Sequence, residues 1–207
     1  DLYEDVLGTY LVKLRDKALS REDNRTINTL LLTINDLERI SDHSVNLLKA
    51  GQEIQEKSIH FSHEAIDDLS VLEAAVQDIV NRTVDAFQKN DCYAAGKIEP
   101  LEQVVDGLVR EVKARHIARL QAGACTIEYG FVLDDLLTNY ERIADHCSNI
   151  AVAMIEVSED RFDTHEYLNH IKNGESPSFD KRYERYRGRY TFEPGPSGTA
   201  AAPEQKK

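Results

Sequence analysis

Apolar residues recur at spacings of three and four along most of the chain, the pattern of helices with one buried face. Breaks in this pattern predict helices over about residues 1–19, 22–57, 63–89, 92–120 and 127–158. Ser20, Ser62 and Thr126 suit the capping position before three of these helices. Pro100 is expected to kink the fourth helix or to mark its restart. Long helices joined by short turns predict an all-α fold built of antiparallel bundles.

The pattern changes after Ser158. Short helices are expected over about 164–173 and 178–190, followed by a disordered tail over 194–207 that is rich in Pro, Gly and Ala. Residues 181–190 are rich in basic and tyrosine side chains. That run suits an RNA-binding or lipid-facing segment, but we favour an amphipathic helix that packs its tyrosines on the bundle and turns its arginines toward the acidic body.

Composition narrows the classes of function. The chain has 207 residues, of which 41% are hydrophobic, and its formal net charge is −12. An acidic surface excludes nucleic acid as the expected partner, because a phosphate backbone is held by basic residues. Three cysteines without paired spacing indicate reduced thiols in a cytosolic setting. No apolar run approaches the roughly 20 residues of a membrane span, and the chain lacks an initial Met, so we expect a soluble fragment of a longer protein.

One stretch of the sequence occurs twice. Residues 36–46 and 139–149 share Glu, Arg, Ile, Asp, His and Asn at a constant offset, 141 − 38 = 103. An internal repeat predicts that one supersecondary unit is used twice.

Each copy of the repeat carries two carboxylates one helical turn apart. These pairs are Glu38 with Asp42 and Glu141 with Asp145. Residues four apart project from the same side of a helix, and here that side also carries apolar residues. Inward-facing carboxylates require a positive partner. A bound cation meets that need, and so does an arginine such as Arg39 or Arg142; the duplication favours the cation.

Further carboxylates precede the second copy. Glu99, Glu102 and Asp106 lie on the preceding helix, where Glu102 and Asp106 are again four apart. An antiparallel hairpin places them beside Glu141 and Asp145, so that four carboxylates line one groove. The corresponding position before the first copy falls near Asp1, since 145 − 106 = 39 and 42 − 1 = 41. We therefore expect the first site to be incomplete.

Enzyme signatures are not found in this sequence. It has no HExxH, GxSxG, P-loop or GxGxxG motif. A di-iron carboxylate enzyme would carry Glu-x-x-His on two helices, whereas His43 and His146 follow the Asp by one residue. We expect these histidines to hydrogen-bond locally or to lie at the bundle edge rather than to bind metal. A metallo-oxidase or phosphohydrolase is kept as the enzymatic alternative.

The residues Leu37, Glu38, Arg39, Ile40, Ser41, Asp42 and His43, and the second set from Tyr140 to His146, resemble the paired signatures of PhoU-type domains. The stretches 8–14, 59–62, 99–102, 125–128 and 162–167 are similar to the C-terminal cytoplasmic PhoU-like region of bacterial sodium/phosphate cotransporters. The resemblance covers about residues 1–158.

The resemblance implies a fold and a site. The fold is two tandem antiparallel three-helix bundles related by pseudo-symmetry, with the first bundle truncated at its N-terminus. The expected units are a first repeat over 1–60, a second over 61–158, short helices over 159–193 and the tail over 194–207. The resemblance also implies multinuclear clusters of iron or zinc. Carried over by position, the ligands are Glu38, Asp42, Glu102, Asp106, Glu141, Asp145 and a remnant, Asp1.

The function that the resemblance implies is regulatory rather than enzymatic. The expected protein is a metal-binding domain of a sodium-dependent phosphate cotransporter (a symporter), at the cytoplasmic face of the cell membrane. Its expected partners are an upstream membrane domain of the same polypeptide, phosphate held through the metal, and a second copy in a homodimer. The alternative is a free-standing PhoU regulator of a phosphate ABC transporter and its signalling kinase.

The two sites should differ in metal affinity. Replacing Glu141 by Ala is expected to remove more bound metal than replacing Glu38 by Ala, because the second site has the fuller set of ligands. Metal titration of the two variants measures the difference, and equal losses would refute the asymmetry.

Overall fold

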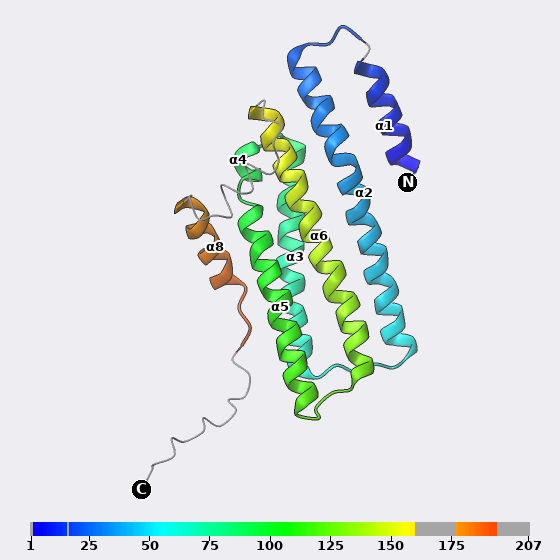
Figure 1. Ribbon diagram of the computed structural model, residues 1–207, viewed down its shortest axis with the longest axis vertical. Helices are drawn as coiled ribbons and strands as arrows, with labels where there is room; N and C mark the ends of the chain where they lie inside the picture. The colour runs from blue at the N-terminus through cyan, green and yellow to red at the C-terminus, as the bar shows by residue number, and fades with distance from the viewer. Residues whose placement is uncertain (1, 16, 160–176, 194–207) are drawn as a thin grey trace.

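The computed structural model describes residues 2–15, 17–159 and 177–193, and all regular structure in these ranges is helical (Figure 1). The helices are α1 (Leu2–Arg15), α2 (Arg21–Glu56), α3 (His63–Lys89), α4 (Cys92–Ala95), α5 (Glu99–Gln121), α6 (Ile127–Glu159) and α8 (Pro177–Arg189). The predicted all-α fold is confirmed. The expected helix over 164–173 and the tail over 194–207 lie outside the described residues.

Local chemistry explains where the helices begin and end. Ser20 and Asp23 form a reciprocal capping box at the start of α2, and Ser62 accepts a hydrogen bond from the backbone of Ala65 at the start of α3. Gly123 follows α5 with a φ of +69°, a conformation that glycine adopts without strain. Pro100 lies in the first turn of α5, where its missing N–H costs nothing, so it marks a restart and not a kink.

Helices α3, α5 and α6 form a three-helix bundle around the main core (Figure 1). Their fully buried side chains interdigitate along the shared axis; they include Leu72, Ile79, Val105, Val112 and Ile150. Two apolar residues of α3, Ile66 and Val84, lie outside this core and are 48% and 42% exposed.

Helix α2 packs lengthwise and antiparallel against α6, and α1 packs on α2 (Figure 1). The described part of the first repeat therefore consists of two helices, and its α2 packs against α6 of the second repeat. Two apolar residues of α2, Val45 and Leu48, are 48% and 63% exposed. The predicted boundary at residues 60–61 falls in the turn between α2 and α3, and the division into domains stays a prediction.

The repeated histidines join α2 to α6. His43 Nδ1 lies 2.8 Å from Asn139 Oδ1, and His146 Nδ1 lies 2.8 Å from Asp36 Oδ1. Asp36 and Asn139 are themselves equivalent in the repeat, since 139 − 36 = 103, so the two contacts join equivalent pairs of positions. The two imidazole rings stack with centroids 5.6 Å apart. The expectation that these histidines bond locally is wrong, because their partners come from the other repeat.

Helix α8 lies along the bundle with its tyrosines inward. Tyr186 and Tyr190 are buried, and the Tyr190 hydroxyl donates to Asp78 of α3 at 2.8 Å. Arg82 of α3 lies over the Tyr186 ring, and Arg189 pairs with Asp78 at 3.4 Å. These contacts match the docked amphipathic helix favoured from sequence. Among the described residues, no helix combines the length and the hydrophobicity that a membrane span requires.

A buried ion pair fastens the start of α3 to the end of α5. The Asp68 side chain is 4% exposed, and its two oxygens accept from Arg115 at 3.1 Å and from Arg119 at 2.9 Å. Desolvated charges of this kind are tolerated only when all partners are present.

Asp68→Ala should lower the free energy of unfolding by about 3 kcal/mol, because Arg115 and Arg119 lose their buried carboxylate partner. The neighbouring Asp67 is exposed, so Asp67→Ala is the matched control and should stay within about 0.5 kcal/mol of the parent. Urea unfolding of the two variants measures both values, and similar losses would contradict the structural role of the pair.

Candidate metal centre

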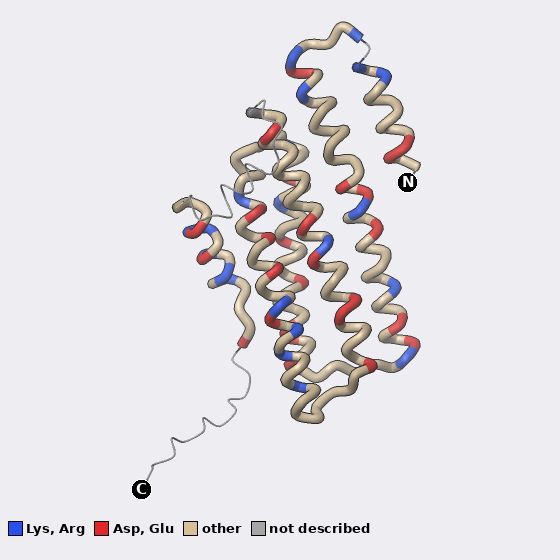
Figure 2. The backbone as a smooth tube through the Cα atoms, viewed as in Figure 1, with Lys and Arg blue, Asp and Glu red and all other residues tan. Residues whose placement is uncertain are grey.

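Three carboxylates converge between α5 and α6. Oxygens of Glu102, Asp106 and Asp145 all lie within 4.8 Å of one another. Glu102 and Asp106 are one turn apart on α5, and Asp145 meets them from the antiparallel α6. Figure 2 shows acidic positions on these two neighbouring helices. The predicted hairpin register therefore brings these three side chains together.

The three carboxylates differ in their exposure to solvent. Glu102 is buried, Asp106 is half-buried, and the Asp145 side chain is 33% exposed. A cavity of about 240 Å³ opens beside them. It is lined by Glu99, Glu102, Arg142, Asp145, His146, Ser148 and Asn149. The site is accessible from one side and walled by the core on the other.

Glu99 extends the acidic wall toward α6. It is buried, and its carboxylate accepts a short hydrogen bond from the Ser148 hydroxyl. Glu99 was noted in the sequence among the neighbouring carboxylates, but Ser148 carried no signal of its own. Its role follows from position, because it comes three residues after Asp145 and so projects from nearly the same side of α6.

The remaining predicted ligands stand apart from this cluster. Glu141 is half-buried and does not belong to the group of converging oxygens. In the first repeat, the Asp42 side chain is 53% exposed, and both Glu38 and Asp42 lie within 4.0 Å of Arg39 nitrogens. Asp1 lies outside the described residues. The described residues thus bring together one set of three carboxylates, in the second repeat.

The donor set fits a cation. Three carboxylates supply hard, anionic oxygens, which Ca²⁺, Mg²⁺ and Mn²⁺ prefer and which iron and zinc also accept. Without a cation, like charges at this distance repel. Arg142 offsets part of the charge, since its guanidinium lies 3.1 Å from Asp145 Oδ2. Glu102, Asp106 and Asp145 would hold the ion.

Cys147 does not belong to this group of donors. It is fully buried two residues after Asp145, and burial raises the pKa of its thiol to about 12. The three converging donors are all carboxylate oxygens.

The fold and this carboxylate cluster define the protein as a helical bundle with a candidate oxygen-ligand cation site. Residues 69–154, which contain α5, the cluster and most of α6, match the family model of the PhoU domain. Over that stretch the chain is similar to the PhoU domain.

A curated relative agrees with this match. The chain is 25% identical over 150 residues to the phosphate-specific transport system accessory protein PhoU homolog 1 of Thermotoga maritima. The alignment covers 72% of this chain and 63% of that protein, so the chain spans less than two thirds of its relative. No solved structure matches the chain.

Glu102→Gln should have opposite effects with and without metal. In metal-free protein it removes one of three clustered charges and should raise the free energy of unfolding by about 1 kcal/mol. In the parent, metal at 100 times its dissociation constant should add about 2.7 kcal/mol, and the variant should lose most of that gain. Thermal unfolding with zinc, iron(II) or manganese, against chelator, measures both effects.

The matched control for this test is Asp135→Asn, an exposed carboxylate of α6 outside the cluster. It should leave the metal-dependent gain intact. If the Glu102→Gln variant keeps the full metal-dependent gain in stability, the cluster is not the metal site.

Proposed function

We propose that this chain is a non-enzymatic regulatory domain of phosphate transport that binds a metal ion through Glu102, Asp106 and Asp145. The observation that carries the proposal is the convergence of these three carboxylates inside the stretch that matches the PhoU domain. The relative's name, an accessory protein of phosphate-specific transport, supports the same role.

The chemistry of the site suits phosphate as a further ligand of the metal. A cation bound to carboxylates on one side keeps positions open toward the cavity, and phosphate oxygens are hard ligands for the same ions. Arg142 lines that cavity and presents a guanidinium, the side chain best suited to phosphate oxygens. Phosphate concentration would then set the charge of this face and so the fit of a partner surface.

Two kinds of full-length protein could contain this domain. In the first, the domain belongs to a sodium-dependent phosphate cotransporter and acts at the cytoplasmic face of the membrane on an upstream membrane domain. In the second, it acts as a free-standing accessory protein of an ABC transporter, which the relative's name fits at least as well. The upstream coding sequence separates them: about 300 residues of hydrophobic helices support the first version, and a start codon just before residue 1 supports the second.

Phosphate should change hydrogen exchange only in metal-loaded protein. With metal bound, millimolar phosphate is expected to slow backbone exchange near the cluster in α5 and α6, because it adds ligands to a shared ion. The control is the Glu102→Gln variant under the same conditions, where the slowing should disappear. Elemental analysis of the purified protein identifies the metal. If phosphate leaves hydrogen exchange of the metal-loaded parent protein unchanged, the proposed coupling between metal and phosphate is wrong.

A further inference from the structure

The cavity beside the carboxylate cluster lies along one face of α6. Arg142, Asp145, His146 and Asn149 line it and are spaced at three or four residues, as side chains on one face of a helix are. Asp145 belongs to the group of converging oxygens, whereas His146 does not. His146 therefore borders the space beside the cluster without being one of its carboxylate ligands.

Asp36 of the first repeat orients two of these side chains. Its Oδ1 accepts a hydrogen bond from His146 Nδ1 at 2.8 Å and another from Asn149 Nδ2 at 3.2 Å. The Asp36 side chain is 13% exposed, so the contact is largely shielded from water. A carboxylate of α2 thus sets the position of two cavity side chains on α6, and the first repeat contributes to the site in the second.

This contact determines which ring nitrogen of His146 carries the proton. An ionised carboxylate offers only lone pairs, so Nδ1 is the donor, and in the neutral ring Nε2 is left as an acceptor. No hydrogen bond joins Nε2 to another described residue. His146 therefore presents a hydrogen-bond acceptor at the cavity.

The internal repeat contains an equivalent contact that has no cavity beside it. His43 Nδ1 lies 2.8 Å from Asn139 Oδ1, and His43 does not line the space at the cluster. An amide is sufficient where the contact only joins two helices, whereas a carboxylate is present where the histidine borders the cavity. The difference between Asp36 and Asn139 indicates a use for the carboxylate beyond packing.

An acceptor in an anion site distinguishes anions that carry a proton from those that do not. Hydrogenphosphate has an O–H group that can donate to a bare imidazole nitrogen. Sulfate has the same tetrahedral shape and the same charge but no proton, so it leaves that acceptor unpaired. Arg142 lines the same cavity and can donate to the remaining oxygens of either anion.

We propose that His146, oriented by Asp36, makes this cavity selective for hydrogenphosphate over sulfate. His146 Nε2 accepts a hydrogen bond from the phosphate O–H group, and Asp36 is the positioning residue that keeps the imidazole in its accepting form. The inference rests on the proposed function, in which phosphate enters this cavity as a further ligand of the metal. It adds the residue that separates phosphate from other tetrahedral anions.

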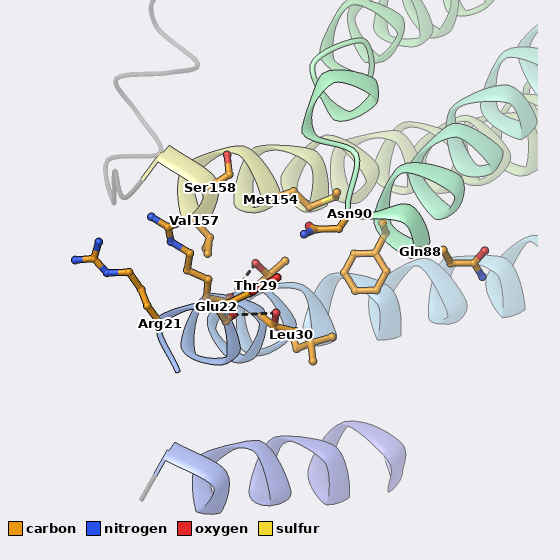
Figure 3. Close-up of a pocket in the computed structure, with 12 residues that line it drawn as sticks. Arg21, Glu22, Thr29, Leu30, Gln88, Asn90, Met154, Val157 and Ser158 are labelled. Carbon is orange, nitrogen blue, oxygen red and sulfur yellow. Dashed lines mark hydrogen bonds between the residues drawn. The ribbon is translucent and has the colours of Figure 1, made fainter. Parts of the chain in front are cut away.

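A larger cavity in the described residues is separable from this site. It has a volume of about 600 Å³, and its walls come from the start of α2 and the ends of α3 and α6 (Figure 3). It shares no lining residue with the cavity at the cluster. Phosphate bound there would depend neither on His146 nor on metal, so the variants below distinguish the two locations.

Equilibrium dialysis of the full chain against radiolabelled phosphate and sulfate measures the preference. The protein is loaded with manganese or zinc and kept at about pH 8, where both anions carry about two negative charges. The parent should bind phosphate at least about tenfold more tightly than sulfate. Because the two anions match in charge, the ratio of their affinities is insensitive to a change in the net charge of the site.

Three variants test the assignment. His146→Phe keeps a ring for the stack on His43 but removes both nitrogens, and it should reduce the preference to about twofold or less. His43→Phe makes the same change at the equivalent contact and should keep the preference of the parent. Asp36→Asn should lower the preference about threefold without lowering the melting temperature, because an amide can either accept from Nδ1 or donate to it.

The outcomes separate this inference from the function on which it rests. Equal affinity of the loaded parent for phosphate and sulfate would overturn the inference and leave the proposed function standing. So would a preference that survives His146→Phe, or one that falls equally in His43→Phe. An unchanged preference in Asp36→Asn would also overturn it, and this milder variant decides the matter if His146→Phe does not fold. If phosphate binds no better with metal than without it, the proposed coupling is wrong, and the inference fails with it.

Discussion

The antiparallel contact between α2 and α6 is the constraint on which the rest of the structure depends. Each helix turns its signature histidine to the other, and the rings stack between the hydrogen bonds to Asp36 and Asn139. Adjacent residues on a helix point about 100° apart. A helix that directs His146 at the other repeat must therefore direct Asp145 elsewhere, and on α6 that direction is toward α5. The same dipeptide thus joins the repeats and orients the carboxylate cluster.

The helix boundaries and the cluster could be predicted from sequence, because both depend on spacing within one helix or one hairpin. The predicted range of α3 matches its observed bounds, and Glu102, Asp106 and Asp145 meet as the hairpin register required. Glu141 was included because it shares a face with Asp145, but residues four apart are separated by about 6 Å along the axis. A pair on α5 can therefore close on one of them without reaching the other.

The histidine contacts could not be predicted, because their partners are 96 and 110 residues away and depend on how the two repeats pack. The exposure of Val45 and Leu48 has a similar origin. Periodicity shows that a helix has an apolar face but not how many neighbours cover it. In the described residues, α6 is flanked by α2, α3 and α5, whereas α2 is flanked by α1 and α6. Equivalent positions in the two repeats therefore carry the same residue types more reliably than they share the same degree of burial.

Helix α6 connects the carboxylate cluster to the contact between the repeats. Glu102 and Asp106 come from α5 and Asp145 from α6, so a cation bound at the cluster would hold these two helices together. The next residue of α6, His146, bonds to Asp36 of α2. To the extent that the packing of α6 on α2 and α5 opens in the free protein as one unit, a cation at the cluster would also favour the contact between α2 and α6.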